Sequence, residues 1–385
     1  MKKKSKATDC VHAGKFIDPI TKGMVTPIYP STSYDYINTE IQAYPRYFNT
    51  PNQKVVSEKL AILEHGETAM VLSSGMAAIS TVLFALLRNG DHAIFQKDLY
   101  GGTYHAILVE MEKFGISYSF VDINNENSIL EEFKSNTRLI YCETPSNPLM
   151  KLTDLKMVSA IAKDSNIASV VDNTFASPIN QNPIDFGCDV VIHSGTKYLG
   201  GHSDICCGAI ISSHELMKLF WGTAIHFGGS LNAETCSLLE RSLKTLALRV
   251  EKQSQNALEI SKYLEKNTLI KKVNYPGLPS HPQYDLAMNQ MSGYGGMLSF
   301  ELNANINEVD KFLENLKIFH TAMSLGGVDS IISTPAKTSH SKMTARQREE
   351  AGISDKLLRA SIGIEDSRDL IEDIDQALSR IKVLV

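Results

Sequence analysis

Apolar and polar positions change their period repeatedly along the middle of the chain. From about residue 55 to residue 212, segments with helical spacing of apolar residues alternate with short apolar runs, and the first four are expected at residues 55–65, 69–73, 76–88 and 92–96. Helices that alternate with short buried strands are typical of a mostly parallel sheet covered on both faces. This part of the chain is therefore predicted to be an α/β domain.

The two ends of the chain differ from this middle part. Residues 1–55 hold five prolines and follow neither period, so they are predicted to be an arm that wraps another surface. Residues 232–267 have a helical pattern long enough to bridge two domains, with or without a bend. The order strand, helix, strand, strand at residues 296–302, 306–316, 318–324 and 357–362, followed by a last helix capped by Asp366 or Ser367, predicts an α+β fold. The expected division is an arm (1–55), a large domain (56–245) and a small carboxyl-terminal domain (246–385).

The overall composition argues against several classes of function. A net charge of −5 and a pI near 6.1 argue against a nucleic-acid-binding protein. No apolar run is long enough to span a membrane and no secretory leader pattern is present, so a cytoplasmic protein is expected. Six cysteines without a Cys-x-x-Cys pair are typical of thiols in a reducing compartment. The spacing of His193, His202 and Cys206 matches no zinc pattern, so no metal is expected.

Lys197 follows a predicted buried strand and stands among small residues. The strand is expected at residues 190–192, and Ser194 and Thr196 lie between it and the lysine. A lysine that forms a Schiff base with an aldehyde cofactor must be partly desolvated, which lowers the pKa of its amine. The two hydroxyl groups could then donate to a phosphate beside it.

A second candidate anion site follows the strand predicted at residues 69–72. The turn after that strand leads into a helix, so the amide groups of Gly75 and Met76 are expected at the amino end of the helix. Backbone donors and the helix dipole both favour a phosphate there.

Asp172 ends the strand predicted at residues 168–172, and Lys197 follows the next strand along the chain. The Asp172 carboxylate and the Lys197 amine are therefore both expected in the crevice at the carboxyl ends of parallel strands. A buried carboxylate needs a cationic partner or a proton. The protonated ring nitrogen of pyridoxal phosphate would be such a partner, and the alternative is a structural Asp172–Lys197 salt bridge.

Three further side chains have a functional and a structural interpretation. Tyr100, next to two glycines, could stack on a flat cofactor ring or pack in a loop. Asn147, between two prolines, could donate to the phenolate oxygen of that ring or form an Asx turn. Arg359, in an apolar strand, could grip a substrate carboxylate or belong to an internal ion pair.

Taken together in order, the motifs resemble the Cys/Met-metabolism family of pyridoxal phosphate enzymes, which includes cystathionine γ-synthases, cystathionine β- and γ-lyases and methionine γ-lyases. The motifs are Ser-Ser-Gly-Met (73–76), Leu-Tyr-Gly-Gly-Thr (99–103), Glu-Thr-Pro-Ser-Asn-Pro (143–148), Val-Val-Asp-Asn-Thr-Phe (170–175), Ser-Gly-Thr-Lys-Tyr (194–198) and Ser-Leu-Gly-Gly (324–327). The resemblance implies fold type I, pyridoxal 5'-phosphate as cofactor, a sulfur amino acid as substrate and a homotetramer of two active dimers. It also implies that Tyr44 and Arg46 reach the cofactor phosphate of the neighbouring subunit.

The same resemblance implies a role for each candidate residue. Lys197 forms the Schiff base, Asp172 pairs with the ring nitrogen and Tyr100 stacks on the ring. The phosphate would be held by Gly75, Met76, Ser194 and Thr196, and the substrate carboxylate by Arg359 with help from Asn147 and Ser324.

Two positions depart from parts of the family. Methionine γ-lyases usually carry cysteine where this chain has Gly102, and cystathionine γ-synthases and γ-lyases often carry glutamate where it has Met323. Both departures favour a carbon–sulfur lyase of trans-sulfuration that β-eliminates cystathionine. The alternatives are a cystathionine γ-synthase, a cystathionine or methionine γ-lyase, and a non-catalytic cofactor-binding protein.

Overall fold

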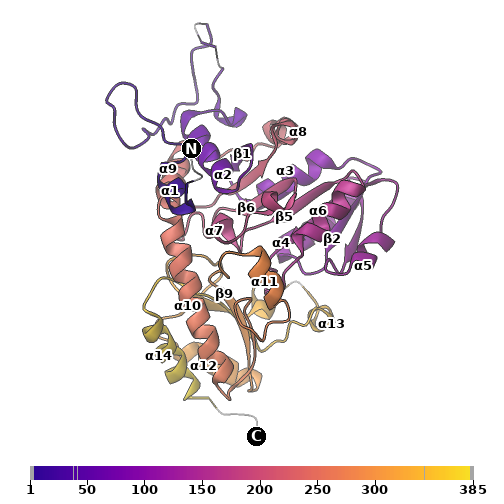
Figure 1. Cartoon of the computed structure of the whole chain (residues 1–385), viewed down its shortest axis with the longest axis vertical. Helices are drawn as coiled ribbons and strands as arrows, with labels where there is room; N and C mark the ends of the chain where they lie inside the picture. Colours follow the sequence, from indigo (N-terminus) through magenta and orange to yellow (C-terminus); the bar gives the residue numbers. More distant parts are fainter. Residues whose placement is uncertain (1–3, 38, 41, 342, 382–385) are drawn as a thin grey trace.

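The structure, a computed structural model, describes residues 4–37, 39–40, 42–341 and 343–381. Its main feature is a pair of β-sheets with helices packed against them (Figure 1). The larger sheet has seven strands in the order β1 Thr68–Leu72, β7 Gly208–Ser212, β6 Val190–Ser194, β5 Ala168–Asp172, β4 Thr137–Glu143, β2 His92–Gln96 and β3 Ser117–Val121.

Most neighbouring strands of this sheet are parallel, which confirms the predicted α/β architecture. The pairs β2–β3, β2–β4, β4–β5 and β5–β6 are parallel, whereas β7 runs antiparallel to both β6 and β1. Successive residues face opposite sides of the sheet: Val170 and Val190 belong to one apolar cluster, and Val171 and Val191 to clusters on the other side. The strands are therefore buried on both faces, which is why they read as continuous apolar runs.

Helices from several parts of the chain cover the two faces of this sheet. They are α2 Pro51–Leu63, α3 Gly75–Leu86, α4 Gly101–Ala106, α5 Glu126–Glu131, α6 Leu155–Asp164, α7 Ser177–Asn180, α8 His214–Phe227 and α9 Ala233–Leu243. A π-helical turn, Ile107–Met111, continues α4, and short 3₁₀ turns lie at Pro45–Tyr47 and Pro183–Phe186.

The smaller sheet is built from the last third of the chain. Its strands are β10 His320–Thr321, β11 Ile331–Ser333, β12 Leu357–Ser361, β9 Met297–Leu302 and β8 Ile270–Asn274, and its helices are α10 Leu246–Lys266, α11 Tyr284–Gln290, α12 Ile306–Asn315, α13 Ala345–Glu350 and α14 Ser367–Leu378. A 3₁₀ turn, Pro335–Lys337, follows β11. Phe300 and Leu358 of the sheet pack with Phe312 of α12 in one apolar core. The helix α10 runs beside both sheets and joins them (Figure 1).

Two elements differ from the pattern expected at residues 232–267 and 318–324. The long helical pattern is divided between α9 and α10, because Lys244 and Thr245 form a tight turn. The Arg249 side chain donates a hydrogen bond to the Ser242 carbonyl oxygen at this turn (2.9 Å). The strand expected at residues 318–324 is only β10, since the backbone then turns at Ser324 (φ 85°) and Gly326 (φ 76°). The turn at Ser324 brings that residue to the site described below.

The amino-terminal segment contains one helix that its proline content did not suggest. α1, Lys6–His12, is capped by Ser5, and the carbonyl oxygen of its buried Cys10 accepts a bond from the Lys59 amine (2.9 Å). The described residues from 14 to 44 form no helix or strand, and parts of them loop out from the body of the molecule (Figure 1), although Pro27 and Tyr29 bond the Asn52 side chain of α2. Ile20, Tyr36 and Ile37 there are 71–87% exposed. Among the described residues, no helix combines the length and apolar character that crossing a membrane requires.

Candidate active site

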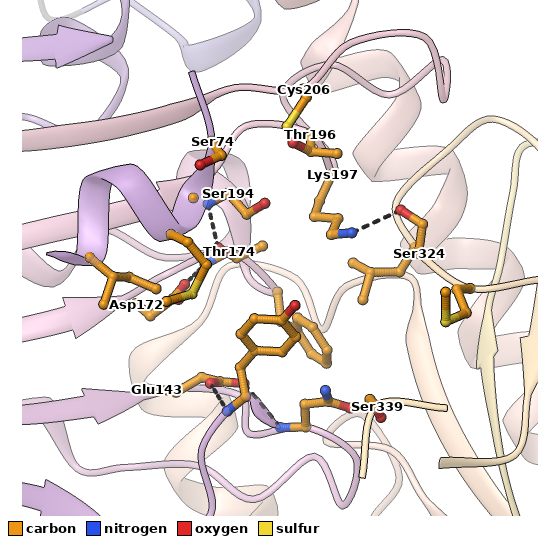
Figure 2. A pocket seen from close by; sticks show the side chains of 18 of the residues that line it. Ser74, Glu143, Asp172, Thr174, Ser194, Thr196, Lys197, Cys206, Ser324 and Ser339 are labelled. Atoms are coloured by element: carbon orange, nitrogen blue, oxygen red, sulfur yellow. Dashed lines mark hydrogen bonds between the residues drawn. The ribbon is translucent and has the colours of Figure 1, made fainter. Parts of the chain in front are cut away.

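A cavity of about 440 Å³ lies at the carboxyl ends of β4, β5 and β6, where residues of the small sheet close it (Figure 2). Ten of the twelve predicted site residues line it: Gly75, Met76, Tyr100, Asn147, Asp172, Ser194, Thr196, Lys197, Ser324 and Arg359. Parallel strands end at one edge of a sheet, so residues distant in sequence meet there.

Lys197 stands in a tight turn just beyond β6. Its backbone N–H donates to the Ser194 carbonyl oxygen (3.1 Å), and its Nζ donates to the hydroxyl of Ser324 (2.8 Å) (Figure 2). Burial lowers the pKa of the Lys197 amine, and the positive charge of Arg359 lowers it further. A neutral amine is the form that attacks an aldehyde.

Asp172 ends β5 and is almost fully buried. Its Oδ1 accepts the backbone N–H of Thr174 (3.0 Å), and the Thr174 hydroxyl oxygen accepts the backbone N–H of Ser194 (2.8 Å). Burial raises the pKa of the Asp172 carboxyl, although the bonds from Thr174 oppose that shift. Within the described residues no cationic side chain pairs with Asp172, so the alternative of an Asp172–Lys197 salt bridge is wrong. The carboxylate is left to meet a cation that enters the cavity.

The expected anion site lies between the first turn of α3 and the end of β6. Ser74 caps α3 by accepting the Ala77 N–H (3.1 Å), and Gly75 and Met76 occupy the first two helical positions, whose amides have no partner within a helix. A Cβ at Gly75 would lie 2.8 Å from the Ser194 Cβ. Only glycine lets the helix end approach the Ser194 hydroxyl this closely, and Thr196 lines the same cavity.

Arg359, in β12, is 5% exposed and forms a bridge between two loops. Its NH1 donates to Asn147 Oδ1 (3.1 Å) and its NH2 to the Ser324 carbonyl oxygen (3.1 Å), while its Nε has no partner among the residues that the structure describes. Burial lowers the pKa of the Arg359 guanidinium to about 10. In the described part of the chain Arg359 forms no ion pair, so the internal-ion-pair alternative is also wrong. A buried guanidinium with a free donor suits an incoming carboxylate.

Tyr44 and Arg46 do not line this cavity. Arg46 donates to the Ile225 carbonyl oxygen (2.6 Å), and its guanidinium carbon lies 5.7 Å from the centre of the Tyr44 ring. Both residues line a separate, shallower hollow with Tyr34, Asp35, Tyr36 and Tyr47, outside this cavity.

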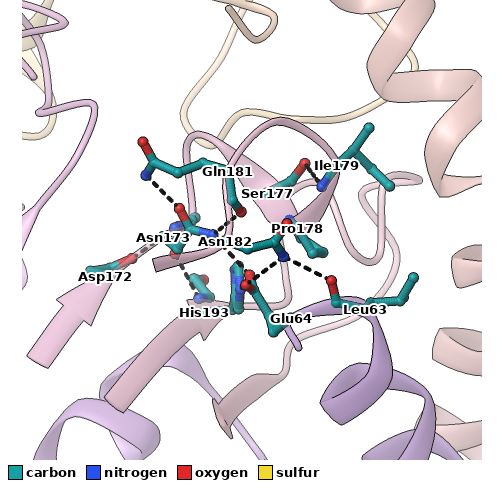
Figure 3. A network of polar contacts seen from close by, with 12 residues as sticks. Leu63, Glu64, Asp172, Asn173, Ser177, Pro178, Ile179, Gln181, Asn182 and His193 are labelled. Atoms are coloured by element: carbon teal, nitrogen blue, oxygen red, sulfur yellow. Dashed lines mark hydrogen bonds and ion pairs between the residues drawn. The ribbon is translucent and has the colours of Figure 1, made fainter. Parts of the chain in front are cut away.

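A buried polar network lies behind Asp172 (Figure 3). The Glu64 carboxylate, at the end of α2, contacts His193 Nε2 (2.5 Å) and accepts bonds from the amides of Asn173 (2.8 Å) and Asn182 (3.2 Å). His193 is therefore the partner of a carboxylate, and no group of three or more metal-ligating side chains occurs among the described residues.

Several residues that line the cavity had no cofactor or substrate role assigned to them from the sequence. They are Glu143, Thr174, Phe175, Cys206, Thr338 and Ser339. A signal existed for Glu143, because it ends β4 as Asp172 ends β5, and the two are paired in register. Ser339 belongs to a loop after β11 that carries no periodic pattern.

The site suits pyridoxal phosphate in each part of that molecule. A desolvated lysine amine suits its aldehyde, a buried acid without a cationic partner suits its ring nitrogen, and the glycine-lined helix end with Ser194 and Thr196 suits its phosphate. Fold and site together define a pyridoxal-phosphate-dependent enzyme of fold type I.

Comparison with known proteins agrees with that class of enzyme and identifies one family within it. The model of the family described as Cys/Met metabolism PLP-dependent enzyme matches residues 7–379. The chain belongs to this family, and pyridoxal 5'-phosphate is its cofactor.

Relatives match over nearly the whole chain. A cystathionine gamma-lyase of Bacillus subtilis is 41% identical over 99% of this chain and 100% of its own length. A cystathionine beta-lyase of Lactococcus lactis subsp. cremoris is 43% identical over 97% of this chain and 98% of its own. The crystal structure of a cystathionine gamma synthase from Xanthomonas oryzae pv. oryzae superposes with a TM-score of 0.95 at 38% identity and covers 98% of this chain and 99% of that one.

Proposed function

We propose that the protein is a carbon–sulfur lyase of trans-sulfuration that cleaves cystathionine by β-elimination. The products would be homocysteine, pyruvate and ammonia. The observation that carries this proposal is the contact between Lys197 and the substrate clamp: Lys197 Nζ bonds the Ser324 hydroxyl, and Arg359 bonds the Ser324 carbonyl oxygen. An amine that moves a proton at the substrate Cα must stand beside the group that holds the substrate carboxylate.

The side chains have distinct roles in this proposal. Arg359 binds the substrate carboxylate through its fork of N–H groups, and Asn147 and Ser324 hold that fork in place. Pyridoxal phosphate, when bound, supplies an electron sink for the Cα electrons. Lys197 anchors the cofactor at rest and then, as a free amine, takes the Cα proton.

The remaining contacts hold the cofactor. Asp172 would pair with the ring nitrogen and Tyr100 would stack on the ring, while Gly75, Met76, Ser194 and Thr196 would bind the phosphate. The bond from Arg359 occupies the Asn147 side-chain oxygen, which leaves the amide NH₂ to donate to the phenolate oxygen.

Two positions support the choice of a β-lyase among the reactions of the family. A Cβ at Gly102 would lie 2.5 Å from the Tyr100 ring, so the cysteine usual in methionine γ-lyases requires a different ring position. Met323 stands at the cavity with 71% of its surface exposed and offers no charge to the distal amino group of a substrate.

Product identification tests this proposal. With cystathionine as the only substrate, we expect pyruvate and homocysteine, because elimination at Cβ leaves a three-carbon oxo acid. Pyruvate is measured against 2-oxobutanoate by chromatography of the derivatised oxo acids. If cystathionine yields neither oxo acid, the lyase proposal fails, and a majority of 2-oxobutanoate would indicate a γ-lyase.

A cystathionine γ-synthase is the second candidate, favoured by the similarity to the Xanthomonas synthase structure. Formation of cystathionine from an O-acylhomoserine and cysteine, without oxo acid from cystathionine, would establish it. A non-catalytic cofactor-binding protein would give neither reaction. The joint presence of Lys197, Asp172, Tyr100 and Arg359 in one cavity argues against that possibility.

We also propose a homotetramer in which each arm completes the site of the neighbouring subunit. The position of Tyr44 and Arg46 outside the cavity of their own subunit supports it, as do the exposed apolar side chains of the arm.

The division into an arm, a domain of residues 56–245 and a domain of residues 246–385 accords with the two sheets. Six free cysteines support a cytoplasmic location.

Complementation between two inactive variants tests the shared site. Lys197→Ala and Arg46→Ala subunits, each nearly inactive alone, are co-expressed with different tags. Random pairing should restore about a quarter of wild-type activity, because half of the dimers are mixed and each mixed dimer has one intact site.

The matched control combines Lys197→Ala with Arg359→Ala. Both residues belong to the cavity of one subunit, so this pair should remain inactive. An inactive Lys197→Ala with Arg46→Ala mixture, purified through both tags, would show that Arg46 serves its own subunit, and an active Arg46→Ala variant would show that it serves neither site.

A further inference from the structure

We infer that Glu143 is a positioning residue that holds Tyr100 and Asn147, two cofactor-facing residues from different loops, on one buried carboxyl group. Its Oε2 accepts the backbone N–H of Tyr100 (2.8 Å), and its Oε1 accepts the backbone N–H of Asn147 (3.2 Å) (Figure 2). The inference rests on the cofactor site and not on which sulfur amino acid is the substrate.

The position of Glu143 is itself well defined. Its backbone N–H donates to Gln96 Oε1 (3.0 Å), the same oxygen that accepts the Thr153 hydroxyl (3.2 Å). The residue is 4% exposed and ends β4 directly beside Asp172. The carboxyl group therefore projects from a rigid strand end, and the two loops adjust to it.

Burying the Glu143 carboxyl group beside that of Asp172 costs folding free energy. Burial raises the pKa of Glu143 well above its usual range, the neighbouring Asp172 raises it further, and the Tyr100 and Asn147 amides oppose the shift. Among the described residues Glu143 forms no ion pair. Buried acids with strongly shifted pKa values in a cleft are typical of functional sites, which fits a role for Glu143 in this one.

The two bonds make Glu143 part of a continuous chain of contacts around the cavity. Asn147 Oδ1 accepts from Arg359, Arg359 donates to the Ser324 carbonyl oxygen, and the Ser324 hydroxyl accepts from Lys197. Glu143 thus connects the stacking Tyr100 at one end to the reactive Lys197 at the other. Tyr100 is 42% exposed, and the Glu143 bond restrains the backbone from which its ring projects.

The test is Glu143→Gln, which keeps the volume but replaces one acceptor oxygen by an NH₂ group. That group faces a backbone N–H, so either Tyr100 or Asn147 loses its acceptor. We expect the apoenzyme to bind pyridoxal phosphate about tenfold more weakly, and kcat/KM to fall by at least about tenfold. Cofactor affinity is measured by fluorescence titration, and hydrogen exchange of full-length protein should accelerate in peptides that contain Tyr100 or Asn147.

Asp373→Asn is the matched control. Asp373 is 3% exposed, and its carboxylate accepts the backbone N–H groups of Lys317 (2.8 Å), Ile318 (2.8 Å) and Phe319 (3.1 Å) in the small domain. It should lose stability without any change in cofactor affinity or in the visible circular dichroism of the bound cofactor.

The inference is overturned if Glu143→Gln keeps wild-type cofactor affinity and wild-type exchange at both loops, or if Asp373→Asn changes the cofactor in the same way. Glu143→Asp covers the case of a poorly folding glutamine variant. The aspartate side chain keeps both acceptor oxygens but is one methylene shorter, so its oxygens lie farther from the two backbone N–H groups. The same loss of affinity for pyridoxal phosphate is therefore expected. The cofactor affinity and the hydrogen exchange do not depend on whether cystathionine is cleaved, so these two readouts are separable from the product assay.

Discussion

Replacing Lys197 with alanine is expected to abolish the absorption of the lysine-bound cofactor and to reduce turnover by at least about 10⁴-fold. The amine has two tasks in the proposed reaction, the covalent anchorage of the cofactor and the transfer of the Cα proton. No other lysine lines the cavity in the described part of the chain, so no second amine can substitute. The absorption spectrum and single-turnover kinetics measure the two tasks separately.

Two controls make the Lys197 result specific. Lys271→Ala removes an exposed lysine paired with Glu301 and should leave both spectrum and rate unchanged. Borohydride reduction of the wild-type enzyme followed by peptide mass spectrometry should find the cofactor on Lys197. Its recovery on a different lysine would refute the assignment.

Replacing Glu64 with alanine is expected to have the largest effect on stability. Glu64 and His193 are 0% and 1% exposed, and the carboxylate also accepts the amides of Asn173 and Asn182. Removing one member of a buried pair leaves the others without partners in a low dielectric, which costs about 3–5 kcal/mol of unfolding free energy. Denaturant unfolding of the apoenzyme at a fixed protein concentration measures the loss.

A neighbouring contact between a histidine and a carboxylate provides the control for Glu64→Ala. His65 Nδ1 contacts Asp185 at 2.8 Å, but the side chains are 21% and 50% exposed. Asp185→Ala should therefore cost less than about 1 kcal/mol, because water already screens the pair. If both variants lost the same unfolding free energy, burial would not be the reason for the large contribution of the Glu64 network to stability.

The Glu64 network also bears on the cofactor. Asn173, which Glu64 holds, directly follows Asp172, and His193 directly precedes Ser194 (Figure 3). Both neighbours belong to the cavity, so Glu64→Ala should release pyridoxal phosphate more readily than the wild type does.

Local pattern was sufficient for the parts of the site that lie at strand ends. Gly75, Asp172, Ser194 and Lys197 each follow an apolar run, and the geometry of a parallel sheet places such positions at one edge. The two salt-bridge alternatives for Asp172 and Arg359 were open in the sequence, because local spacing does not show which charges become neighbours. The structure gives each of them neutral hydrogen-bond partners instead.

Other parts of the site depend on contacts that no local pattern encodes. Ser324 and Ser339 come from irregular segments of the last third of the chain, and Glu143 acts through backbone amides rather than through a motif. The sequence left open whether the helical pattern at residues 232–267 bends, since apolar spacing continues across Lys244 and Thr245, where the Ser242 carbonyl oxygen accepts from both Thr245 and Arg249.

The sequence by itself determined the alternation of strands and helices, the family and most of the candidate site residues that line the cavity, because these follow from short-range spacing and local motifs. Only the tertiary structure decided which side chains meet. Lys197 bonds Ser324 from 127 positions away, and Arg359 bonds Asn147 from 212 positions away. Such partners are set by the packing of the small sheet against the ends of the large one, which is a property of the whole fold and not of any segment.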